Sequence, residues 1–203
     1  MLEVRLLIKA IIFDFGGVIA QEASPFIYES ISHEVNLNKD EVKERMKPFT
    51  IKFQKREIEE TDYWTSIAKA LNSVFPDKIK DIFLKVFAEH SNLNPEVVDL
   101  VKKLKKNNYK VAILSNQILG EPNYSLKEVK DLFDVVVISF EVGMRKPDDE
   151  IYNYIVEKLQ VRPDECIFID NREVNLPPAQ NMGMKTILFE SSEQLEKELE
   201  KMM

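Results

Sequence analysis

The sequence predicts an α/β fold: a doubly wound parallel sheet with an inserted all-helical cap. From Asn94 onward, short apolar runs alternate with amphipathic helical segments, the pattern of parallel strands joined by crossover helices. Between the first apolar run and Asn94, apolar residues recur at helical spacing and glycine is almost absent. We therefore expect a core formed by residues 1–19 and 93–203, and a cap formed by residues 20–92.

The composition fits one core domain with a smaller appended unit. The chain has 203 residues, of which 44% are hydrophobic, and a net charge of −7 with no basic stripe, so we expect no nucleic-acid partner. The single cysteine, Cys166, excludes a disulfide framework, and two distant histidines are too few for a zinc site.

The sequence also bears on location. Charged residues interrupt Met1–Lys9, which argues against a signal peptide, and no apolar run is long enough to span a bilayer. We expect a cytoplasmic protein without a membrane partner, and the oligomeric state stays open.

The rest of the chain is organised around Ala10–Val18. Its apolar beginning predicts a strand buried on both faces, and Asp14 stands where that strand ends. Gly16 and Gly17 allow a tight turn that brings backbone N–H groups close to a ligand. Open α/β sheets build their sites at such strand ends, although Asp-x-Gly-Gly also fits an ordinary turn.

Four helices are predicted within residues 20–92. Asn38 is the expected cap of the second helix, Thr61 or Asp62 that of the third, and Pro76 separates the third from the fourth. The aromatic residues of these helices are typical of core packing. An all-helical insertion directly after a site-bearing strand could also act as a lid that excludes water.

The remaining segments alternate between helix and strand. Asn94 is expected to cap a helix at Pro95–Asn107, and Ser191 to open the last helix. The other predicted helices are Tyr124–Leu132 and Asp149–Leu159. The predicted later strands are Lys110–Leu114, Val135–Ser139, Cys166–Ile169 and Met184–Phe189, with a loop after the second of these.

Polar residues follow the predicted strands at four places: Asp14, Ser115, Asp170 and, in a loop, Lys146. Because the carboxyl ends of parallel strands meet at one edge of a sheet, we expect these side chains to converge. The set suits a phosphorylated ligand with Mg²⁺. Asp14 could attack phosphorus while Ser115 and Lys146 hold the non-bridging oxygens, and Asp170 could bind the cation. Each residue alone also fits an ordinary cap, turn or solvated loop.

Four motifs occur in this order: Phe13–Val18, Leu114–Asn116, Glu141–Asp148 and Phe168–Arg172. With them the chain resembles the haloacid dehalogenase superfamily of hydrolases, in the branch with a helical cap after the first strand. Within that superfamily it is most similar to the sugar-phosphate phosphatases and to the phosphatase-like domain of soluble epoxide hydrolases. The resemblance covers nearly the whole chain and implies a Rossmann-like core.

The resemblance also implies roles for individual residues. Asp14 would become a phosphoaspartate, and Lys146 would stabilise the charge of the nucleophile and the phosphoryl group. The implied phosphate-binding residues are Phe15, Gly16, Ser115, Asn116 and Lys146. The implied Mg²⁺ ligands are Asp14, the Gly16 carbonyl, Asp170 and Asn171.

Two positions depart from the pattern of the family. Gly16 stands where its phosphatases usually carry an aspartate that acts as acid and base, and losing a general acid commonly costs about 10²–10⁴ in rate. Asn171 stands where a metal-binding aspartate is more common. An amide oxygen can still coordinate Mg²⁺, but one negative charge is lost, so we expect weaker affinity.

The leading hypothesis is a Mg²⁺-dependent phosphatase of a small phosphorylated metabolite. One alternative is a catalytically weakened or inactive relative that binds a phosphorylated ligand or partner. Another is a metal-free 2-haloacid dehalogenase, for which Ser115, Lys146 and Tyr152 would fit. Against the dehalogenase, Asp170 stands where those enzymes carry a serine.

Overall fold

The chain folds around one parallel sheet, as predicted. The computed structural model describes residues 7–118 and 124–203, and within them five strands lie in the order β3-β2-β1-β4-β5. All neighbouring pairs are parallel. The strands are β1 (Ala10–Phe13), β2 (Lys110–Ser115), β3 (Val135–Ile138), β4 (Cys166–Asp170) and β5 (Lys185–Leu188). The order of the strands reverses at β1, the place where open α/β sheets bind ligands.

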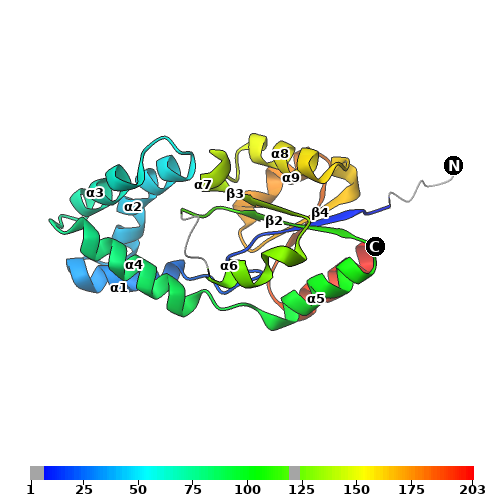
Figure 1. The fold of residues 1–203 in the computed structure, drawn as a ribbon, viewed down its shortest axis with the longest axis horizontal. Helices are drawn as coiled ribbons and strands as arrows, with labels where there is room; N and C mark the ends of the chain where they lie inside the picture. The colour runs from blue at the N-terminus through cyan, green and yellow to red at the C-terminus, as the bar shows by residue number, and fades with distance from the viewer. Residues whose placement is uncertain (1–6, 119–123) are drawn as a thin grey trace.

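Helices cover both faces of this sheet (Figure 1). One face packs against α5 (Pro95–Lys106), α6 (Tyr124–Val129), the 3₁₀ turn η1 (Lys130–Leu132) and α10 (Ser192–Met202). The other face packs against α8 (Asp149–Leu159) and α9 (Leu176–Asn181). Successive residues of a strand point to opposite faces, so that Ile11 belongs to the first layer and Ile12 to the second.

Four helices, α1 to α4, pack together beyond the carboxyl ends of the strands (Figure 1). They are α1 (Ser24–Val35), α2 (Lys39–Gln54), α3 (Glu60–Ala70) and α4 (Pro76–His90). Their buried side chains form a cluster of their own, in which the rings of Phe53 and Tyr63 stack at a centroid distance of 4.6 Å. We call these four helices the cap. Its division from the core at residues 20–92 stays a prediction.

Side-chain oxygens begin three of the helices as predicted. Each accepts a hydrogen bond from the backbone N–H three residues later: Asn38 from Glu41, Asn94 from Val97, and Ser191 from Gln194. The predicted cap of α3 is wrong. This helix begins at Glu60, so Thr61 and Asp62 lie inside its first turn. There the negative charge of Asp62 interacts favourably with the positive end of the helix dipole.

Two short helices lie where the sequence predicts none. The segment after β3 is the single turn α7 (Ser139–Val142), and α9 lies between β4 and β5. The remaining 3₁₀ turns are η2 (Pro163–Glu165) and η3 (Glu173–Asn175). Across the described ranges, no helix combines the length and the apolar character needed to cross a bilayer. Most of Met1–Lys9, to which the expectation about a signal peptide applies, lies outside the described residues.

Candidate active site

Asp14 directly follows β1 and is almost completely buried. Its backbone N–H donates to the carbonyl of Ile169 at 2.8 Å, which extends the ladder between β1 and β4 by one residue. Its side-chain Oδ1 accepts a hydrogen bond from the Phe15 N–H at 2.7 Å. The carboxylate is therefore held in a defined orientation at the end of the central strand.

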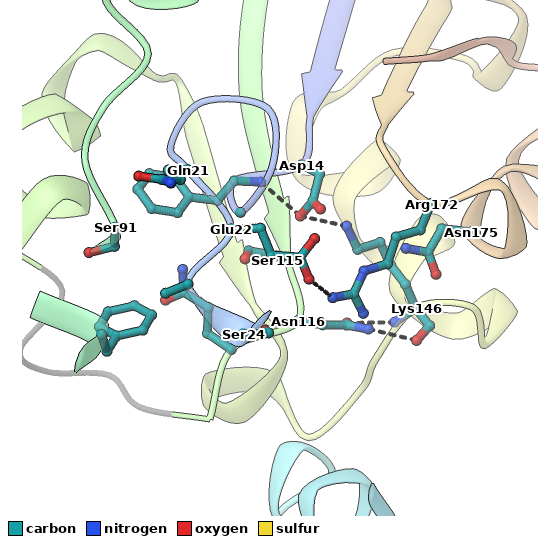
Figure 2. A pocket seen from close by; sticks show the side chains of 15 residues that line it. Asp14, Gln21, Glu22, Ser24, Ser91, Ser115, Asn116, Lys146, Arg172 and Asn175 are labelled. Carbon is teal, nitrogen blue, oxygen red and sulfur yellow. Dashed lines mark hydrogen bonds and ion pairs between the residues drawn. The ribbon is translucent and has the colours of Figure 1, made fainter. Parts of the chain in front are cut away.

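Lys146 lies between the carboxylates of Asp14 and Asp170, although 132 and 24 positions separate it from them. Its Nζ is 2.8 Å from Asp14 Oδ1 and 2.7 Å from Asp170 Oδ2. The lysine side chain is only 1% exposed, so it is not a solvated loop residue. Figure 2 shows Asp14 and Lys146 pointing toward one another. One buried ammonium therefore bridges the two carboxylates that sequence analysis expects to converge.

The side chain of Asn116 fixes the backbone of Lys146. Its Oδ1 accepts from the Lys146 N–H at 2.9 Å, and its Nδ2 donates to the Lys146 carbonyl at 2.8 Å. Both ends of the amide are thus engaged by the loop that carries the lysine (Figure 2). Asn116 follows β2, so this pair of bonds fastens the Lys146 loop to the edge of the sheet.

Asp170, the last residue of β4, is completely buried and accepts hydrogen bonds at both oxygens. Asn175 Nδ2 lies 3.0 Å from each oxygen, and the Arg172 N–H donates to Oδ1 at 2.8 Å. Together with Lys146, these donors satisfy a buried charge that would otherwise be costly. Asp170 therefore fixes the position of Lys146.

The environment of Asp14 changes its acidity. Burial raises the pKa of the Asp14 carboxyl from its usual value to about 6, and the negative charge of Asp170 acts in the same direction. The ammonium of Lys146 and the Phe15 N–H oppose this by stabilising the carboxylate. A second cation close to Asp14, in addition to Lys146, would favour the ionised form of the Asp14 carboxyl further.

Asn171 directly follows Asp170, and its side chain packs against Gly17. A Cβ added to Gly17 would be 2.2 Å from Asn171 Nδ2, so only glycine leaves room for the amide. Nδ2 donates to Glu22 Oε2 at 3.2 Å, and Glu22 is also paired with the guanidinium of Arg172. The opposite end of the amide, Oδ1, is buried without a hydrogen-bond partner among the described residues.

These residues fit a magnesium ion. Buried polar atoms are normally hydrogen-bonded, so the partnerless Asn171 Oδ1 is suited to a ligand, and hard cations prefer oxygen donors of this kind. Within residues 7–118 and 124–203, no group of three His, Cys, Asp or Glu side chains is placed to hold a metal. An ion at this site would therefore depend on carboxylate, amide and backbone oxygens together.

A pocket of about 100 Å³ opens in front of Asp14. Of the predicted site residues, Asp14, Phe15, Gly16, Ser115, Asn116 and Lys146 line it. Ser24 of α1 and Phe87 of α4 line it from the cap side. This volume accommodates a group the size of a few water molecules, which suits a tetrahedral oxyanion.

Sequence reasoning missed Glu22 and Arg172 among the residues that line the pocket. Glu22 and Arg172 both line the pocket and face one another in Figure 2. Glu22 lies in the loop before α1, and its partners are 149 and 150 positions away in the chain. No local pattern connects residues so far apart, so only the fold brings them together.

Several known proteins are similar to this chain in sequence. A family model described as haloacid dehalogenase-like hydrolase matches residues 8–183. The bifunctional epoxide hydrolase 2 of Mus musculus is 34% identical over 142 residues, which are 66% of this chain and 26% of that protein. The phosphorylated carbohydrates phosphatase of Thermotoga maritima is 24% identical over 188 residues, which are 88% of this chain and 83% of that protein.

The chain spans about a quarter of the length of the first curated relatives that it matches. Among solved structures, a HAD family enzyme from Bacteroides thetaiotaomicron in complex with magnesium has a TM-score of 0.72 at 25% identity, covering 90% of this chain and 93% of that one. A structure described as a dehalogenase has a TM-score of 0.64 at 19% identity, covering 92% of this chain and 85% of that one, and shares the fold alone.

Proposed function

The chain belongs to the haloacid dehalogenase-like hydrolases, and from this premise we propose that it is a Mg²⁺-dependent phosphatase of a small phosphorylated metabolite. The observation that carries the proposal is the buried Lys146 ammonium, 2.8 Å from Asp14 and 2.7 Å from Asp170 at the head of the pocket. A cation fixed beside a carboxylate in a small polar pocket is suited to binding a phosphoryl group.

In the proposed reaction, Asp14 is the nucleophile. A carboxylate oxygen of Asp14 attacks phosphorus and the bond from phosphorus to the leaving-group oxygen breaks, which leaves a phosphoaspartate. With Gly16 two positions later, no side chain there can protonate the leaving group, which takes its proton from water. Water then attacks the phosphoaspartate, releasing phosphate and restoring the carboxylate.

Around the phosphoryl group, we assign Ser115 and Lys146 as side-chain donors. The side-chain amide of Asn116 is already engaged by Lys146, so we assign its phosphate contact to the backbone. The Phe15 N–H donates to Asp14 and so orients the nucleophile. We therefore treat the predicted contact of Phe15 with phosphate as its secondary role. The Gly16 backbone remains available because it has no side chain to block the pocket.

We propose that Asp14, the Gly16 carbonyl and Asn171 Oδ1 hold the magnesium ion. The resemblance also implies Asp170 as a magnesium ligand. Because both of its oxygens already have partners, we assign it an indirect role, in which it holds Lys146 in place. When bound, Mg²⁺ would neutralise charge between the nucleophile and the phosphoryl oxygens. The protein would position the ion through oxygen atoms of the segment that follows β1 and of the residue that follows β4.

The dehalogenase alternative receives little support. Tyr152 is fully buried, its hydroxyl donates to the carbonyl of Asn175 at 2.7 Å, and it is absent from the described lining of the Asp14 pocket. Its contact supports Asn175 and through it Asp170. The binding-only alternative rests on Gly16 and Asn171, and experiment separates it from the proposal.

The test measures phosphate release from 4-nitrophenyl phosphate with and without Mg²⁺. We expect turnover that requires the ion, is abolished in Asp14→Asn and persists in Asp164→Asn, a matched change before the amino end of β4. Turnover that survives Asp14→Asn or removal of the metal would overturn the proposal. Binding of the phosphate analogue vanadate without any turnover would favour the binding-only alternative.

A further inference from the structure

A second cavity, of about 500 Å³, lies under the cap and adjoins the Asp14 pocket. Both spaces are lined by Ser24 and Phe87 from the cap and by Asn116 and Arg172 from the core. Its volume is typical of sites that bury a whole small molecule. If the phosphoryl group occupies the Asp14 pocket, the leaving group extends into this cavity, so the lining identifies the class of substrate.

A large part of the wall is apolar or aromatic and comes from the cap. These side chains include Ile27, Met46, Ile51, Tyr63, Phe83 and Phe87. Such a surface is favourable for an apolar body, because burying it against these side chains removes both surfaces from water.

Three neutral polar side chains of the wall already have partners. Thr50 and Tyr63 are hydrogen-bonded to one another at 3.2 Å, and Thr50 also donates to the Met46 carbonyl at 3.1 Å. The side-chain amide of Gln54 bonds at both ends, to Arg145 and to the carbonyl of Asn116. A polyhydroxylated leaving group would have to compete with these existing bonds to pair its hydroxyls with the three side chains.

The charges of the wall are of one sign. Lys43, Lys47, Arg145 and Arg172 line the cavity, and its described lining contains no aspartate or glutamate. The whole chain, by contrast, has 35 acidic against 28 basic residues. A cationic wall in an acidic protein favours an anionic guest.

Arg145 is the cation best placed to bind it. It is half-buried, and its Nε donates to Gln54 Oε1 at 2.9 Å, which anchors the guanidinium through one nitrogen. The acidic residue nearest in sequence, Asp148, is paired with Lys55 at 2.6 Å. No described carboxylate forms an ion pair with Arg145, so its terminal amino groups remain for another acceptor.

We propose that the substrate is a phosphate monoester whose leaving group has an apolar body and carries a second anionic group, which Arg145 binds. The inference rests on the proposed function, because it takes the Asp14 pocket as the phosphoryl site. Gln54 is the positioning residue: it comes from the end of α2 and holds the guanidinium over the cavity. A planar guanidinium fixed in this way suits a carboxylate or a phosphate.

The experiment compares 4-carboxyphenyl phosphate with 4-carbamoylphenyl phosphate, which have nearly the same shape and differ by one charge. Binding is measured by calorimetry in Asp14→Asn with Mg²⁺, and turnover is measured in the natural protein. We expect the carboxylated compound to bind on the order of tenfold more tightly. Arg145→Gln should bring this ratio close to one. Gln54→Glu should lower it, because a carboxylate at residue 54 neutralises Arg145.

Arg56→Gln is the matched control, because Arg56 lies two residues after Gln54 and is absent from the described lining of the cavity. It should keep the ratio. Turnover of both compounds without any preference in binding would overturn the inference and leave the phosphatase function standing. A preference in binding that depends on Arg145, without turnover, would keep the anion site and remove the phosphatase function. If neither compound bound to Asp14→Asn and neither was turned over by the natural protein, both the inference and the phosphatase function would be overturned.

Discussion

The carboxylate of Glu22 accepts a hydrogen bond from Asn171 Nδ2 at 3.2 Å, while the other end of the same amide, Oδ1, is buried without a described partner. A carboxylate can only accept hydrogen bonds, so it selects the nitrogen end of the amide. The oxygen end is thereby left without a hydrogen-bond donor, which suits the role of magnesium ligand proposed for it. Glu22 also supplies a negative charge close to the position where Asn171 replaces the usual aspartate.

This relationship predicts the magnesium affinity of variants at both positions. Glu22→Gln can offer its own N–H₂ group to Asn171 and no longer selects the orientation of the amide, so we expect Mg²⁺ to bind roughly tenfold more weakly. In an Asn171→Asp background the effect should reverse. Two carboxylates would then face one another, and Glu22→Gln would relieve the repulsion and strengthen binding.

Isothermal titration with Mg²⁺ measures all four proteins of this double-mutant cycle without any need for turnover. Glu173→Gln serves as control, because this exposed residue is absent from the described linings of the pocket and the cavity. Equal losses of affinity from Glu22→Gln in both backgrounds would mean that Glu22 acts through its negative charge or on general stability, and would contradict its role in orienting the amide.

Lys146→Met should destabilise the fold strongly. It leaves Asp14 and Asp170 buried without their shared cation, and breaking such a pair costs about 3–5 kcal/mol. Lys197→Met removes an exposed pair with Glu193 and should change the free energy of unfolding by less than about 1 kcal/mol. Urea unfolding at neutral pH compares the two, and similar small changes would contradict the assigned importance of the buried ammonium.

The raised pKa of Asp14 predicts how stability depends on pH in the metal-free protein. The pKa of its carboxyl is about 6 in the folded chain, against 3.8 for an ordinary aspartate, so the folded state holds the proton more tightly. The resulting stabilisation is complete below about pH 4 and is lost as the pH rises through about 6. Asp14→Asn should remove this loss.

Unfolding measured between pH 4 and 7 in the natural protein and in Asp14→Asn checks this sign. The natural protein should lose stability relative to the variant as the pH rises, and parallel curves would contradict the prediction. Because attack on phosphorus needs the carboxylate, phosphate release should also fall below about pH 6. Saturating Mg²⁺ should move that fall to lower pH, because the cation favours ionised Asp14.

Gly17→Ala and Gly183→Ala separate backbone strain from a steric effect. Both glycines have positive φ, +93° and +95°, so alanine should cost each a similar amount, about 1–2 kcal/mol. Only at Gly17 would the new Cβ displace Asn171 Nδ2. We therefore expect similar losses of stability, with weaker Mg²⁺ binding in Gly17→Ala alone. Unchanged magnesium affinity in both variants would argue against Asn171 as a ligand.

Local signals predicted most of the fold. Apolar runs such as Cys166–Ile169 mark buried strands, and the side-chain oxygens of Asn38, Asn94 and Ser191 mark the beginnings of helices. The exceptions are elements that tertiary packing decides. The single turn of α7 is too short for a periodic pattern, and the second and third residues of α9, Pro177 and Pro178, also fit a loop.

The candidate site was predictable only in part. Asp14 and Asp170 follow recognisable strands, so the topology alone brings them to one edge of the sheet. The burial of Lys146 could not be anticipated, because it depends on the two hydrogen bonds between the Asn116 side chain and the Lys146 backbone, 30 positions apart in the chain. Glu22 gives no signal in the sequence, because its role depends on a hydrogen bond with Asn171, which is 149 positions away.

Gly16 offers a direct way to ask what the missing acid costs. A Cβ built on Gly16 meets no atom within 4 Å, and Gly16 lines the Asp14 pocket, so a side chain can begin there without a clash at its Cβ. Gly16→Asp should raise the rate on alkyl phosphates by about 10²-fold, because a poor leaving group gains most from protonation. On 4-nitrophenyl phosphate, whose leaving group needs little protonation, the gain should be much smaller. Gly16→Asn has the same size without a titratable proton and should give no gain on either substrate. If Gly16→Asn matched Gly16→Asp, the improvement would come from filling space, and the phosphatase would have to protonate its leaving group by another route.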